Sequence, residues 1–89
     1  MPVISMFYGI IVSLYLLDSQ RHHRAHIHVK YQDDEAVTAI PDGELLEGSL
    51  PPAKLKLVHA WIEIHRDELM ADWELAVGGQ QPFRIDPLR

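Results

Sequence analysis

The chain has 89 residues, of which 47% are hydrophobic and 24% charged, so it fits one compact domain over residues 1–89 and leaves no room for a second. It contains no cysteine, which excludes disulfide frameworks and zinc–thiolate sites. Eight lysines and arginines against thirteen acidic residues give a net charge of −5, which disfavours nucleic-acid binding through bulk charge.

The first apolar run extends from Met6 to Leu17 and has only twelve residues. A helix that crosses a bilayer needs about 20 apolar residues, so we expect no membrane-spanning segment here. No lysine or arginine precedes the run, and the residues after Leu17 do not resemble a signal-peptide cleavage site. We therefore expect a cytoplasmic protein with no membrane partner.

Three strands are predicted in the first half of the chain. Residues 10–17 are rich in β-branched and aromatic side chains and lie between Gly9 and Asp18, as is typical of a buried strand. Residues 26–31 alternate polar and apolar side chains, which indicates a strand with one buried face. Residues 35–40 form the third predicted strand.

A turn at Asp33 and Asp34 would join the last two strands into a hairpin. The predicted core face then carries Ile27, Val29 and Tyr31 beside Ile40, Thr38 and Ala36. The opposite face carries His26, His28 and Lys30 with Val37 and Ala39.

One long helix is predicted over about residues 52–77. Pro51 and Pro52 are typical of a helix start, apolar residues then recur at spacings of three and four, and Gly78 with Gly79 marks the end. Residues 80–89 read as an extended tail. The expected fold class is α+β, with a small antiparallel three-stranded sheet packed on one long C-terminal helix.

Such a helix is too long for its own domain. About 25 residues span about 37 Å, whereas a domain of this size is about 30 Å across. The helix must therefore bend, break or pack its end against a second copy. Two tryptophans on the apolar stripe favour the last option, so we expect a homodimer with Trp73, Leu69 and Ala76 in the interface. His65 lies on the same stripe and is expected to be a hydrogen-bonded core residue.

The side chains that could bind a metal ion or take part in catalysis lie just before and within the second predicted strand. Residues 19–32 contain three basic side chains and four histidines, without one acidic residue. An acidic protein therefore carries a local positive patch. The members are Arg21, Arg24, Lys30, His22, His23, His26 and His28.

One interpretation of this patch is a metal site. His26 and His28 share a strand face, with α-carbons about 6.6 Å apart, which suits two imidazoles on one divalent ion, Zn²⁺ or Ni²⁺. His22 or His23 would add a third ligand, and Asp18 an oxygen ligand or a partner that orients an imidazole.

The other interpretations need no metal. His26 and His28 would act as general acid and base on a phosphodiester, as in a small ribonuclease of the toxin type, while basic side chains stabilise the phosphate. Alternatively, the patch docks an acidic partner protein or a short nucleic-acid segment without chemistry. In the simplest alternative, these histidines are ordinary polar residues of an exposed strand face and its loop.

Four stretches of the chain carry a resemblance to a known family. They are PVISMFYGIIV at residues 2–12, HRAHIHV at 23–29, IPDGELLEG at 40–48 and LVHAWIEIH at 57–65. Together they resemble the uncharacterised bacterial family of domain of unknown function 4160, whose loop before the His-x-His strand usually carries prolines where this chain has Arg24 and Ala25. The resemblance implies a small α+β domain in the bacterial cytoplasm, encoded beside a partner protein in a pair of the toxin–antitoxin kind. It transfers no catalytic residue.

Overall fold

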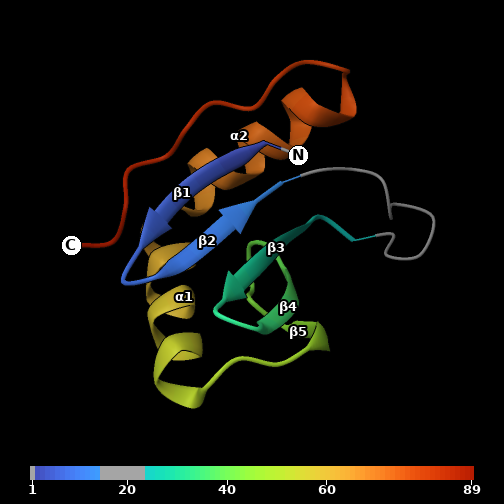
Figure 1. The fold of residues 1–89 in the computed structure, drawn as a ribbon. Coiled ribbons are helices and arrows are strands. Elements are labelled where there is room, and N and C mark those ends of the chain that lie inside the picture. Colours follow the sequence, from blue (N-terminus) through green and yellow to red (C-terminus); the bar gives the residue numbers. More distant parts are fainter. Residues whose placement is uncertain (1, 15–23) are drawn as a thin grey trace.

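The computed structural model describes residues 2–14 and 24–89, which form a five-stranded antiparallel sheet and two helices. In chain order, the elements are β1 (Val3–Phe7), β2 (Ile10–Ser13), β3 (His26–Tyr31), β4 (Asp34–Ala39), β5 (Leu45–Gly48), α1 (Pro52–Ile64) and α2 (Arg66–Val77). The strands are neighbours in the order of the sequence. Figure 1 shows both helices on one side of the sheet, which we call the inner side, and the C-terminal tail beside β1.

The prediction of a three-stranded sheet on one helix was wrong, first because β1 was missed. The turn at Tyr8 and Gly9 folds the apolar run back on itself, with φ angles of 50° and 81°. A tyrosine seldom adopts this left-handed conformation, so the sequence pattern does not predict the turn. Of the predicted strand 10–17, only Ile10–Ser13 is a strand in the structure, and residues 15–17 lie outside the described residues.

The second missed strand is β5, at the edge of the sheet beside β4. It has four residues and no alternation of buried and exposed side chains, so the period-2 signal is missing. Gly48 ends it with a φ of 73°.

The hairpin of β3 and β4 was predicted in the wrong register. Its turn lies at Gln32 and Asp33, and Gln32 adopts a φ of 54°. Tyr31 therefore pairs with Asp34 instead of Ala36. Because this shift is two residues, Ile27 and Val29 stay on the predicted core face, whereas His26, which was predicted on the opposite face, is fully buried against Trp73 of α2.

The predicted single helix is broken at His65, whose φ of −111° and ψ of 25° separate α1 from α2. The longest dimension of the molecule is 33 Å, and the break lets both halves remain on one sheet. The His65 ring is partly buried and donates from Nδ1 to Glu68 Oε1 at 2.6 Å. Within residues 2–14 and 24–89, neither helix has the length and hydropathy to cross a bilayer.

Trp61 lies at the centre of the core with no exposed surface. The centroid of its ring lies 5.3 Å from the ring centroid of Phe7 in β1 and 5.6 Å from that of His65. The indole N–H donates to the carbonyl oxygen of Asp86 at 2.8 Å, and the backbone N–H of Ile85 donates to the carbonyl of Ile4. The tail is thereby fixed between the sheet and the helices.

Replacement of Gly48 by alanine is expected to lower the free energy of unfolding by about 3 kcal/mol or more. The new Cβ would lie 2.1 Å from the carbonyl oxygen of Glu35, in addition to the strain of the left-handed backbone. Gly79 is the matched control, since its φ is 84° and a Cβ added there would meet no atom within 4 Å beyond its chain neighbours. Gly79→Ala should lose only about 1–2 kcal/mol, and equal losses in urea denaturation would contradict the role assigned to the clash.

Candidate functional site

The two histidines of β3 lie together, as their spacing predicts. Their ring centroids are 5.4 Å apart in an edge-on arrangement. His26 has no exposed surface, packs its ring 5.0 Å from that of Trp73 in α2, and donates from Nδ1 to the carbonyl of Arg24 at 2.8 Å. His26 is therefore part of the packing between β3 and α2, and the description of an ordinary exposed polar residue does not fit it.

His28 is partly buried on the outer face of the sheet, which is the face turned away from the helices. The register places it between Ser13 of β2 and Val37 of β4. The strand therefore carries two neighbouring imidazoles, of which His26 is fully buried and His28 partly buried.

The other predicted metal ligands, Asp18, His22 and His23, lie outside the described residues. Within residues 2–14 and 24–89, no group of three or more histidine, aspartate and glutamate side chains could hold a metal ion. The described contribution to the predicted metal site is thus the pair of His26 and His28.

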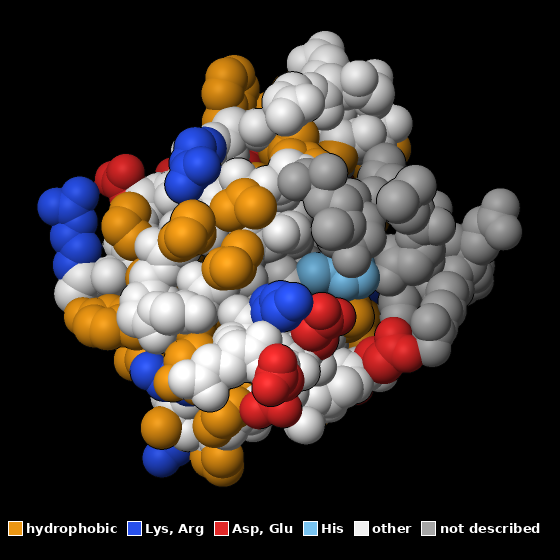
Figure 2. Space-filling view, in the orientation of Figure 1, with side chains coloured by type: hydrophobic (Ala, Val, Ile, Leu, Met, Phe, Trp, Pro, Cys, Tyr) orange, Lys and Arg blue, Asp and Glu red, His pale blue; other side chains and the backbone are white. Residues whose placement is uncertain are grey.

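The basic residues near the histidines are paired with acids from later in the chain. Arg24 donates to Asp42 at 2.5 Å and also to Glu44, and the hydrogen bond to Glu44 is the main cause that raises the pKa of Arg24. Lys30 lies 3.7 Å from Glu35 of β4. Figure 2 shows basic and acidic side chains next to each other beside the pale blue histidine. The positive charge expected from Arg24 and Lys30 is therefore balanced, while Arg21 lies outside the described residues.

The three predicted interface residues all pack on their own chain. Leu69 is fully buried in the core, and Trp73 and Ala76 are partly buried against it. The break at His65 removes the overhang from which this interface was inferred. The homodimer itself stays a prediction.

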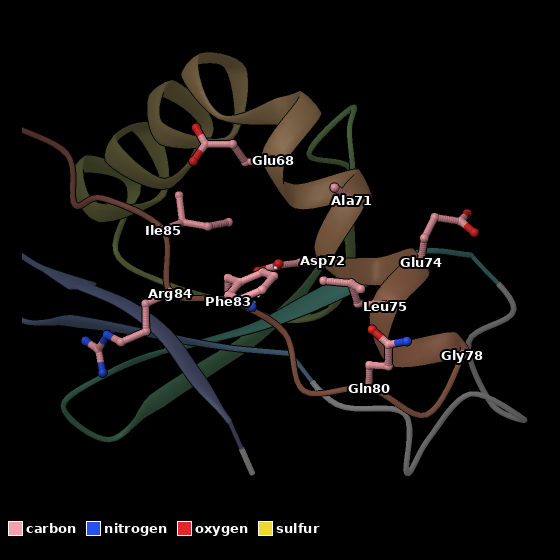
Figure 3. A pocket seen from close by; sticks show the side chains of 10 residues that line it. All are labelled: Glu68, Ala71, Asp72, Glu74, Leu75, Gly78, Gln80, Phe83, Arg84 and Ile85. Atoms are coloured by element: carbon pink, nitrogen blue, oxygen red, sulfur yellow. Dashed lines mark hydrogen bonds between the residues drawn. The ribbon is translucent and has the colours of Figure 1, made fainter.

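A second candidate site, which the sequence reasoning missed, lies between α2 and the C-terminal tail. It is a groove of about 540 Å³. Its lining residues are Glu68, Ala71, Asp72, Glu74, Leu75, Gly78, Gln80, Phe83, Arg84 and Ile85. Figure 3 shows them from close by. One signal was present in the sequence: Asp72 stands on the apolar stripe of the helix, three residues after Leu69 and four before Ala76.

Asp72 is the polar centre of this groove and is only 3% exposed. Its Oδ1 accepts the backbone N–H of Phe83 at 3.0 Å, while its Oδ2 is buried without a hydrogen-bond partner among the described residues. Burial raises the pKa of Asp72, the hydrogen bond from Phe83 opposes this, and the charge of Glu68 adds to the rise. The groove thus contains a carboxyl group that is poorly stabilised in its ionised form.

Comparison with known proteins identifies the family. The family described as Domain of unknown function (DUF4160) matches residues 9–74, from the turn before β2 to the last part of α2. The chain belongs to this family. No curated protein and no solved structure matches it.

Replacement of His26 by alanine is expected to lower the free energy of unfolding by about 2–4 kcal/mol, because it removes a buried ring and its hydrogen bond. Lys30→Ala is the control on the same strand, where loss of an exposed ion pair should change stability by less than about 1 kcal/mol. Urea denaturation measures both. A similar small effect at both positions would show that the contact between His26 and Trp73 does not stabilise the fold.

Proposed function

We propose that this chain is a protein-binding domain, one component of a gene pair of the toxin–antitoxin kind, whose partner protein covers the outer face of the sheet. The observation that carries the proposal is the apolar pair of Met6 and Ile11 on this face. The two residues are direct partners across β1 and β2.

The two faces of the sheet differ in what covers them. The inner face is buried under α1 and α2, whereas no helix of the described residues lies on the outer face (Figure 1). Met6 is 55% exposed there, and hydrophobic side chains gather over β1 and β2 in Figure 2. Contiguous apolar surface that is bordered by charged residues is typical of a protein–protein contact.

The charge arrangement favours binding over phosphodiester cleavage. A ribonuclease would need cations that face the developing charge of a phosphate, but Arg24 and Lys30 are held by Asp42, Glu44 and Glu35. The chain resembles a family whose members look like components of small gene pairs, and this resemblance supports a protein as the partner.

The double variant Met6→Glu/Ile11→Glu should lose binding to the protein encoded by the neighbouring gene by about tenfold or more, since it places two charges in an apolar contact. Ile64→Glu is the control, because Ile64 is 64% exposed on α1 and lies away from the outer face. Co-purification and light scattering, with and without the partner, measure the effect. If the chain alone forms a dimer that only the double variant disrupts, the face binds a second copy and the proposal of a different partner fails.

A second candidate function, binding of Zn²⁺ or Ni²⁺, is favoured by the hydrogen bond of His26. Donation from Nδ1 to the Arg24 carbonyl fixes the tautomer that has its lone pair on Nε2, and metal-binding histidines are commonly oriented in this way. The ring of His28 is its neighbour.

Titration calorimetry should then show divalent-metal binding that weakens as the pH falls, because ligation needs neutral imidazole. His28→Ala should lower the affinity by about tenfold or more, and it spares the buried ring of His26. Equal affinities for the variant and the unmodified protein would rule this site out.

A further inference from the structure

We propose that the groove between α2 and the C-terminal tail binds a small primary amine with an apolar body, whose ammonium group is held by the carboxylate of Asp72. This site is separate from the outer face of the sheet and does not depend on the protein partner proposed above.

The walls of the groove are predominantly apolar. Ala71 and Leu75 come from α2, and Phe83 and Ile85 come from the tail. In Figure 3, Leu75 and Phe83 lie close to Asp72, which places apolar surface around the carboxyl group. The volume of about 540 Å³ is in the range of sites for small organic ligands.

The unpaired oxygen of Asp72 specifies what the ligand must supply. A buried carboxylate oxygen without a donor is unfavourable, and a charged donor relieves this more than a neutral one. Phe83, whose backbone holds the other oxygen, is 72% exposed, so its side chain can move aside without loss of core packing.

The charges of the lining select a cation. Three carboxylates, those of Glu68, Asp72 and Glu74, stand against the single guanidinium of Arg84. Figure 3 shows the Arg84 side chain directed away from Asp72, and Glu68 and Glu74 extend outward from the helix. An anionic ligand would meet a negative field here, whereas an ammonium group is attracted.

A small molecule fits the groove better than a segment of a protein does. The tail forms one wall and is tied down through Ile85 and Asp86, so this wall keeps its place and the groove stays narrow. Specific protein interfaces bury about 800 Å² on each partner, far more than these ten lining residues offer.

The negative charge of Asp72 does not stabilise the fold. Its pKa is raised in the folded chain, so ionisation of Asp72 destabilises the fold as the pH rises from the ordinary aspartate value through the raised one. Asp72→Asn keeps an oxygen for the Phe83 N–H and removes the charge. The variant is therefore expected to melt no lower than the unmodified protein at pH 7, which makes it a suitable test of binding.

The experiment is a titration of the protein with 2-phenylethylamine, followed by amide chemical shifts in NMR, with 2-phenylethanol as the uncharged probe. The amine should bind with a dissociation constant of about 0.1–1 mM, as is usual for a ligand of this size. The alcohol and the Asp72→Asn variant should each bind roughly 10- to 100-fold more weakly, the range for a hydrogen bond to a charged group. Glu74→Gln, which removes a charge from the rim of the same groove, should weaken the affinity by only about two- to threefold, because this carboxylate adds to the negative field without holding the ammonium group.

Three outcomes would overturn the proposal. Equal binding of amine and alcohol would show that only the apolar walls matter. Equal weakening by Asp72→Asn and Glu74→Gln would show a general negative field in place of a site at Asp72. Binding of the peptide acetyl-Leu-Lys-amide without binding of the amine would assign the groove to a segment of a protein.

Discussion

The burial of Trp61 is the constraint on which the rest of the molecule depends. An indole ring removed from water must find an acceptor for its N–H, and the acceptor here is the carbonyl of Asp86, 25 residues further along the chain. The same ring packs on Phe7 in β1 and on His65 at the junction of the helices. One side chain thus ties together the first strand, the break between the helices and the tail.

The break at His65 decides where the residues of α2 point. With two helices in place of one rod, Leu69 enters the core, Trp73 meets His26 of β3, and Asp72 faces the tail. The hydrogen bond between His65 and Glu68 in the first turn of α2 stabilises this new direction. The buried histidine and the groove therefore have a common origin in the change of helix direction.

The alternation of polar and apolar residues predicted the structure correctly where the side-chain pattern alone decides it. Alternation gave the core face of β3 with Ile27 and Val29, and the proximity of His26 to His28, because a strand repeats every two residues. It did not predict the burial of His26 against α2. The turns at Tyr8 and Gln32 were not predicted, because both residues adopt left-handed backbone angles that tyrosine and glutamine rarely show. The break at His65 has no glycine or proline to mark it and follows from the size of the sheet. The partners of Arg24 come 18 and 20 residues later, beyond the reach of any local pattern.

The family match covers each candidate site only in part. Residues 9–74 include the histidine pair, the acidic partners of Arg24, Trp61 and Asp72, whereas Phe83 and Ile85 lie beyond the matched span. The matched span therefore contains part of each site: Ile11 and the histidine pair of the sheet, and Asp72 of the groove, but neither Met6 nor the tail. The second wall of the groove is supplied by the tail, and the tail is held in place by Trp61 within the matched span.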